Sequence, residues 1–170
     1  MMVIVMGVSG CGKTTVGRAL ARELRAEFLD GDDFHPAANV AKMARGIPLT
    51  DEDRWPWLDA IGAAMRERAA RGRGVVVACS ALKHAYRERL RHGGGAEGDV
   101  RFVYLKGDAA TIAPRLASRD AHFMPPSLLA SQFAALEEPA GAIVADIRQT
   151  PEAQARQIAA ALRSALDSAA

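Results

Sequence analysis

The stretch that decides the fold is Gly7-Val8-Ser9-Gly10-Cys11-Gly12-Lys13-Thr14. It fits the pattern G-x-x-x-x-G-K-[ST], whose glycines let a loop turn tightly and bring backbone N–H groups close to phosphate oxygens. The apolar, β-branched run of residues 2–6 precedes it and predicts a buried strand, and apolar residues recur at helical spacing over residues 16–24. Strand, glycine-rich turn and helix form the context that the pattern requires, so we expect a phosphate-binding loop that opens a helix near Lys13.

The loop predicts the ligand as well as the local fold. A lysine in the position of Lys13 reaches the β- and γ-phosphates of a nucleotide, and the hydroxyl of Thr14 can ligate Mg²⁺. A helix N-terminus also carries a partial positive charge that attracts anions. We therefore predict binding of ATP or GTP with Mg²⁺; the alternative is a chance match in a turn before a helix. The predicted nucleotide contacts are Gly7, Val8, Ser9, Gly10, Cys11, Gly12, Lys13, Thr14 and Thr15.

Composition narrows the class of protein. With 170 residues, of which 49% are hydrophobic, the chain is expected to form one domain, residues 1–170, around a substantial core. The net charge of +2 and the lack of a Lys/Arg block argue against nucleic-acid binding. Cys11 and Cys79 form no C-x-x-C pair, which argues against a disulfide framework and a zinc site. The sequence contains no apolar run of membrane-spanning length and no leader signal, so we expect a cytoplasmic protein without membrane contact.

Strands and helices alternate along the rest of the chain. The apolar patterns predict further strands at residues 27–29, 75–78, 101–105 and 142–145. They predict helices at residues 36–44, from 51 onward, and at 81–91, 111–119, 127–136 and 152–166, with a glycine-rich surface loop at 92–98. Five strands that alternate with helices predict a three-layer αβα fold, with a parallel sheet covered on both faces. Ligands of such sheets bind beyond the carboxyl ends of the strands, so the residues that follow each strand are the candidates for function.

The second strand leads into Asp30-Gly31-Asp32-Asp33-Phe34-His35, which places three carboxylates and a histidine at one strand end. Near Mg²⁺·ATP, one acid can hold a water of the metal shell and another can accept the proton of an attacking hydroxyl. The alternative is a solvated acidic turn, because turns favour Asp and Gly. The neighbouring phosphate loop favours the functional interpretation.

A second candidate segment is Asp51-Glu52-Asp53-Arg54-Trp55-Pro56-Trp57-Leu58. The guanidinium of Arg54 can fork onto a substrate carboxylate or phosphate; the alternative is a surface ion pair with Asp51 or Glu52. For Trp55 we expect core packing, because it shares one helical face with Leu58 and later apolar residues.

The segment after the third strand, Cys79-Ser80-Ala81-Leu82-Lys83, contains no acid. P-loop ATPases and GTPases usually place an aspartate there for the metal, so its absence argues against a switch or motor protein and suits a small-molecule kinase. Lys83 can meet an anionic substrate at the strand tip, or it can remain a solvated lysine at the start of a helix.

A basic stretch follows the fourth strand. Arg115, Arg119 and His122 flank Asp120 ahead of two prolines. Arginines on a mobile segment can close over a triphosphate and stabilise the charge that develops during transfer. The alternative is a basic helix end that interacts with its own dipole. We favour the first interpretation for Arg119.

Together these segments resemble the P-loop gluconokinases, which phosphorylate D-gluconate on its 6-hydroxyl with ATP and are related to shikimate kinase. The similarity spans most of the chain, and the segments between the loop and the fifth strand are far more specific than the loop alone. The segments that carry it are Gly7 to Thr14, Asp30 to Pro36, Asn39 with Lys42-Met43, Gly46 to Leu49, Asp51 to Leu58, Cys79 to Lys83 with Tyr86-Arg87, His122 to Met124, Ser131 to Phe133 and Leu136 to Pro139.

The resemblance implies a fold of the shikimate-kinase and nucleoside-monophosphate-kinase type, with sheet order 2-3-1-4-5. It also implies an acceptor-binding segment at about residues 32–60, a lid at about residues 115–128 and a homodimer. Beside Lys13, it implies Asp32 as the base for the substrate hydroxyl and Asp30 beside Thr14 for Mg²⁺. It implies that Arg119 lies near the phosphates and that gluconate is bound by Asp32, His35, Arg54, Lys83 and His122.

Two alternatives stay open from the sequence. One is another small-molecule kinase of the same fold, acting on shikimate or a nucleoside monophosphate. The other is a nucleotide-dependent switch or binding module without an acceptor.

Overall fold

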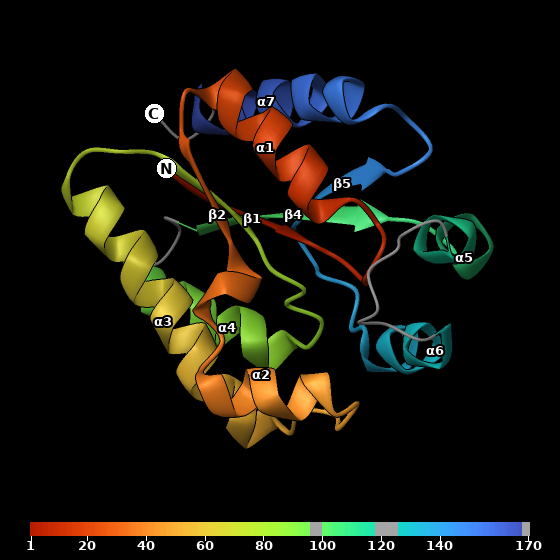
Figure 1. Cartoon of the computed structure of the whole chain (residues 1–170). Helices are drawn as coiled ribbons and strands as arrows, with labels where there is room; N and C mark the ends of the chain where they lie inside the picture. The colour runs from red at the N-terminus through yellow and green to blue at the C-terminus, as the bar shows by residue number, and fades with distance from the viewer. Residues whose placement is uncertain (96–99, 118–125, 168–170) are drawn as a thin grey trace.

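The computed structural model describes residues 1–95, 100–117 and 126–167 (Figure 1). Along the chain, the described elements are β1 (Met2–Met6), α1 (Lys13–Leu24), β2 (Glu27–Asp30), the 3₁₀ turn η1 (Gly31–Phe34), α2 (Ala37–Ala44), α3 (Asp51–Ala70), β3 (Val75–Ala78), α4 (His84–Gly94), β4 (Val100–Lys106), α5 (Ala109–Ala117), α6 (Pro126–Ala135), β5 (Ile143–Asp146) and α7 (Pro151–Asp167).

The five strands form one parallel sheet in the order β2-β3-β1-β4-β5, which confirms the predicted fold class. β1 lies at the centre, where Val3 pairs with Val76 of β3 and Val5 pairs with Val103 of β4. After β1 the chain forms β2 and β3 on one side of that strand, and it later forms β4 and β5 on the other side. The crevice where ligands bind therefore opens beside the end of β1. The phosphate loop follows that strand directly.

Alternation along β1 divides the core into two halves. Val3 and Val5 belong to the apolar cluster that packs against α1 and α7, whereas Ile4 and Met6 belong to the cluster that packs against α3 and α4. Successive strand residues point to opposite faces of the sheet, and all five residues of β1 are buried. Figure 1 shows the resulting three layers, with α1 and α7 on one face and α3 and α4 on the other. A strand buried on both faces is a rigid support for the loop that follows it.

Helix α4 differs from the sequence prediction at both ends. It begins at His84 instead of residue 81, because Ala81 adopts a left-handed backbone with φ of 44°. The buried side chain of Arg87 holds this turn, since its Nη1 donates to the carbonyls of Ala81 (3.0 Å) and Leu82 (2.9 Å). The helix continues to Gly94, so the first part of the expected loop at 92–98 is helical.

Helix α5 begins two residues before the expected start at 111, and the end expected at 119 lies outside the described residues. Within the described part of the chain, no helix has both the length and the apolar character needed to cross a membrane.

Candidate active site

The phosphate loop has the backbone geometry that its glycines predict. Gly7, Gly10 and Gly12 have φ values of 144°, 80° and 101°, a region that side chains disfavour. A Cβ on Gly10 would lie 2.8 Å from the side chain of Leu116, so the position has no room for one. α1 begins at Lys13 with Gly12 as its N-cap, and no side chain caps its first turn. The uncapped N–H groups therefore remain available for the oxygens of a phosphate.

Thr14 and Asp30, the two residues predicted to serve the metal, lie in direct contact. Thr14 Oγ1 donates to Asp30 Oδ2 at 3.0 Å, which joins the start of α1 to the end of β2. Both side chains offer hard oxygen ligands of the type that Mg²⁺ binds. In the described ranges no group of three His, Cys, Asp or Glu side chains could hold a metal. Thr14 and Asp30 are therefore the pair of side chains that could hold Mg²⁺ beside a bound phosphate.

Lys13 and Asp32 extend this nucleotide-side cluster. Lys13 Nζ donates to the carbonyl of Val8 at 3.0 Å, so the ammonium lies over its own loop. The backbone N–H of Asp32 donates to Asp30 Oδ1 at 3.2 Å. Desolvation raises the pKa of Asp32, with the neighbouring Asp30 charge adding to the rise and the Lys13 ammonium opposing it. The surface of the Asp32 residue is nevertheless exposed, so its more basic carboxylate is accessible to an acceptor.

His35 lies on the acceptor side and is held in one orientation. Its ring stacks on Trp57 with a centroid distance of 4.2 Å and an interplanar angle of 13°. Asn39 Nδ2 donates to the Asp53 carbonyl at 2.8 Å and lies 3.3 Å from His35 Nδ1. Because an amide nitrogen only donates, Nδ1 accepts and the ring proton lies on Nε2. Burial lowers the pKa of His35 to about 4, with the charge of Arg54 adding to the effect. His35 is therefore a neutral N–H donor at pH 7.

Arg54 and Lys83, predicted to bind an anionic substrate, both lie near the ring of one tyrosine. The guanidinium of Arg54 lies 5.6 Å from the ring centroid of Tyr86, and so does the ammonium of Lys83. Lys83 Nζ contacts both oxygens of Asp51 at 2.9 and 3.1 Å, and the Tyr86 hydroxyl donates to the same carboxylate. Arg54 Nη1 donates to the carbonyls of Leu49 (2.5 Å) and Thr50 (3.4 Å).

These contacts also set the charges of the acceptor side. The Tyr86 hydroxyl and then Lys83 lower the pKa of Asp51, and Asp51 in turn raises the pKa of Lys83. Near pH 7, Asp51 is therefore negatively charged, Lys83 is positively charged and Tyr86 is neutral.

The predicted lid cannot be placed, because Arg119 and His122 lie outside the described residues. Of that basic stretch, Arg115 is described, and its Nη2 donates to the Ile147 carbonyl at 2.7 Å. This bond ties the end of α5 to the residue that follows β5.

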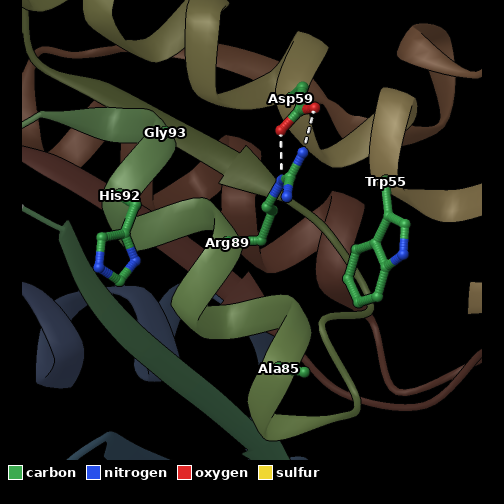
Figure 2. Close-up of a pocket in the computed structure, with 6 residues that line it drawn as sticks. All are labelled: Trp55, Asp59, Ala85, Arg89, His92 and Gly93. Atoms are coloured by element: carbon green, nitrogen blue, oxygen red, sulfur yellow. Dashed lines mark hydrogen bonds and ion pairs between the residues drawn. The ribbon is translucent and has the colours of Figure 1, made fainter. Parts of the chain in front are cut away.

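A hollow of about 490 Å³ lies between α3 and α4 (Figure 2). Its lining residues are Trp55, Asp59, Ala85, Arg89, His92 and Gly93. The two charged side chains pair with each other, since Arg89 donates to both oxygens of Asp59 at 2.6 and 2.7 Å. None of the predicted site residues lines this hollow, so the nucleotide-side and acceptor-side clusters remain the candidate site.

The core packing predicted for Trp55 is only partial, because Trp55 lies at the edge of the apolar cluster, whereas Trp57 lies inside it. Trp57 is 2% exposed, and its Nε1 donates to the Gly31 carbonyl at 2.7 Å, whereas Trp55 is half-buried. Trp57 is buried by its contact with the turn η1, which contains Gly31. The apolar periodicity of α3 describes that helix alone and therefore could not predict a contact with another segment.

Sequence reasoning did not include among the predicted site residues three side chains that shape the acceptor side: Asn39, Asp51 and Tyr86. Asn39 stands four residues after His35, and this spacing is the one local signal that could have identified it. Asp51 and Tyr86 are 35 positions apart, so only the packing of α3 on α4 brings them together.

Comparison with known proteins finds relatives over most of this chain. A family model described as an AAA domain matches residues 2–139. The thermosensitive gluconokinase of Escherichia coli (strain K12) is 49% identical over 136 residues, covering 80% of this chain and 71% of that protein. The gluconokinase of Gluconobacter oxydans (strain 621H) is 50% identical over 137 residues, covering 81% of this chain and 75% of that protein.

A solved structure extends the match to almost the whole fold. The crystal structure of a gluconokinase from Sinorhizobium meliloti 1021 has a TM-score of 0.86 and 45% identity, covering 98% of this chain and 94% of that one. Identity this high over most of both chains exceeds what a shared fold alone produces. The chain therefore belongs to the AAA-domain family of P-loop proteins and, within it, to the gluconokinases.

Proposed function

We propose that this enzyme transfers the γ-phosphoryl group of ATP to the 6-hydroxyl of D-gluconate, which gives 6-phospho-D-gluconate and ADP. One observation carries the proposal. At one edge of the sheet, an uncapped helix N-terminus and the Thr14–Asp30 pair lie beside the acceptor-side cluster, whose side chains suit a sugar acid. The identity of 49–50% with two gluconokinases supports the choice of acceptor.

On the nucleotide side, the enzyme contributes position and charge, because phosphoryl transfer needs little covalent help. The N–H groups of the loop and of the first turn of α1 bind the phosphates, and Lys13 moves from the Val8 carbonyl onto the β- and γ-oxygens. Thr14 and Asp30 would hold Mg²⁺, whose charge would offset that of the phosphates. We also propose that Arg119 stabilises the charge of the transferred group and that His122 contacts the acceptor.

On the acceptor side, Asp32 accepts the proton of the 6-hydroxyl as the oxygen attacks the γ-phosphorus. Its raised pKa makes it a stronger base than an ordinary aspartate. His35 donates from Nε2 to a hydroxyl of the chain. Arg54 and Lys83 bind the carboxylate end.

The charges around Tyr86 fit one carboxylate. Two cations, Arg54 and Lys83, lie at this ring beside one carboxylate, Asp51. At this end of the acceptor side one positive charge is therefore left over, which matches the single negative charge of an aldonate. We assign this acceptor function to residues 32–60 together with Lys83.

The decisive experiment measures ADP formation with gluconate in a coupled assay, with shikimate and nucleoside monophosphates as parallel acceptors. We expect turnover with gluconate and only background hydrolysis with the others. Preferred turnover of shikimate or a nucleotide would overturn the acceptor assignment. Slow hydrolysis that no acceptor stimulates would indicate a nucleotide-dependent switch.

We further propose that the enzyme works as a homodimer in the cytoplasm. Light scattering of the purified protein tests the first point: a mass near 18 kDa instead of twice that value would contradict it.

A further inference from the structure

We propose that residues 132–137, called here the brace, are positioning residues that join the phosphate loop to the loop after β3 and make nucleotide and acceptor binding mutually favourable. The brace spans the end of α6 and the turn that follows it. Its role for the acceptor rests on the proposed function, whereas its effect on the loop after β3 can be measured with nucleotide alone.

Gln132 makes the first link. Its Oε1 accepts a hydrogen bond of 2.6 Å from the backbone N–H of Ser9, across a sequence separation of 123 residues. Ser9 lies inside the phosphate loop, where the position of each backbone N–H decides how the loop fits a phosphate. A side chain from a distant helix therefore fixes one peptide group of the nucleotide site.

Glu137 makes the second link, on the acceptor side. Its backbone N–H donates to the Leu82 carbonyl at 2.9 Å, and its Oε2 accepts from the backbone N–H of His84 at 2.5 Å. These two bonds enclose Lys83, whose ammonium is assigned to the substrate carboxylate. The Glu137 carboxylate also lies at the N-terminal turn of α4, where a negative charge is favourable.

Between the two links, the brace is anchored in the interior. The side chain of Leu136 packs against both apolar clusters, one on each face of the sheet. In Figure 1 the chain that leaves α6 returns from it to β5. The two hydrogen-bonded ends, Gln132 and Glu137, are thus five positions apart and share one packed support, so a shift at either end is transmitted to the other.

The two loops also touch directly, since the N–H of Gly7 donates to the Ser80 carbonyl at 3.3 Å. This bond is long and is made by backbone alone, whereas the brace contributes the shorter bonds. Nucleotide that orders the phosphate loop should therefore order residues 79–84 through the brace, and the acceptor should then bind to a site that is already arranged.

The test uses hydrogen exchange of the whole protein, with and without a saturating non-hydrolysable ATP analogue, in peptides that cover residues 79–86. The variants are Gln132→Met and Glu137→Met, which remove an acceptor at similar length, and Glu137→Gln, which keeps an acceptor oxygen. Ser131→Ala is the matched control, because its hydroxyl bonds only to Leu128 of the same helix turn in the described contacts.

We expect the analogue to slow exchange in this segment about fivefold or more in the wild type and in Ser131→Ala, the lower end of usual coupling factors. Both methionine variants should lose this protection while still binding the analogue, and Glu137→Gln should recover part of it. Protection that persists in Gln132→Met and Glu137→Met, or that is missing from the wild type, would overturn the proposal.

A second measurement separates this proposal from the proposed function. The affinity for the analogue is measured with and without gluconate, and we expect gluconate to tighten binding in the wild type but not in the methionine variants. If gluconate is not phosphorylated, the proposed function fails even though the hydrogen-exchange result stands. If gluconate is phosphorylated and the exchange patterns of all variants are alike, the brace fails and the function stands.

Discussion

The nucleotide side and the acceptor side of the candidate site are built by different means. The phosphate loop depends on its backbone geometry. It has three glycines with positive φ, it leads into an uncapped helix start, and its residues Val8 and Cys11 are buried. The acceptor side is made of partly exposed side chains, such as His35 and Arg54, held by hydrogen bonds and ion pairs. Binding by backbone depends on the fold and tolerates varied side chains, whereas binding by side chains chooses the substrate.

The largest expected effect is that of Lys13→Ala. Lys13 is the one side chain of the loop assigned to the transferred phosphoryl group, so its loss should lower kcat by roughly 1,000-fold, as for other groups that stabilise developing charge. Steady-state assays and circular dichroism test this together. A folded variant with near-normal kcat would show that backbone alone suffices on the nucleotide side.

Asp32→Asn should lower kcat by about 100-fold, the lower end of general-base contributions. A base must be deprotonated to act, so in the wild type kcat/KM should fall as pH drops through the raised pKa of Asp32. That acid limb should be absent from the variant. A variant with normal kcat, or with an unchanged acid limb, would remove Asp32 from the role of base.

Arg54→Ala tests whether the acceptor side depends on side-chain identity. We expect KM for gluconate to rise roughly tenfold or more, with little change for ATP, because a charge-assisted hydrogen bond of about 1.5 kcal/mol is lost. Arg71→Ala, at the other end of α3 and paired with Glu67, is the control. Equal effects on both KM values would move Arg54 away from the acceptor.

Gly10→Ala tests the backbone side. The new Cβ would meet Leu116 at 2.8 Å, so KM for ATP should rise several-fold. Gly72→Ala, with a similar φ of 71° and open space around it, is the matched control. Both variants should lose about 1 kcal/mol of unfolding free energy from positive φ, but only Gly10→Ala should affect ATP. A normal KM for ATP in Gly10→Ala would contradict the view that the backbone geometry of the loop determines nucleotide binding.

The last prediction concerns stability and pH, and it does not involve turnover. The pKa of His35 is about 4 in the folded chain and 6.5 as a model value, so the unfolded chain takes up the proton first as pH falls. Its neutral ring thus contributes stability that is fully present above pH 6.5 and is lost as pH falls toward 4. Urea unfolding at several pH values should give a shallower pH dependence for His35→Gln. Equal slopes would show that burial of His35 is unimportant.

Local sequence was enough for the phosphate loop and for the layered sheet. Eight consecutive residues, with a strand before and a helix after, specify a loop that binds its ligand mostly through its own backbone N–H groups. Strand ends in a parallel sheet share one edge, so the position of the acidic segment beside the phosphate loop also followed from the sequence, whereas the place of Asp30 beside Thr14 was implied by the family resemblance.

Tertiary structure decided what no local pattern contains. The contact of Trp57 with η1 and the ion pair between Lys83 and Asp51 both depend on segments far apart in sequence. The bond from Ser9 to Gln132 is the extreme case, since 123 positions separate its ends. Backbone conformation follows local sequence because a loop and its neighbours interact at short range, whereas side-chain partners are chosen by the packing of whole elements.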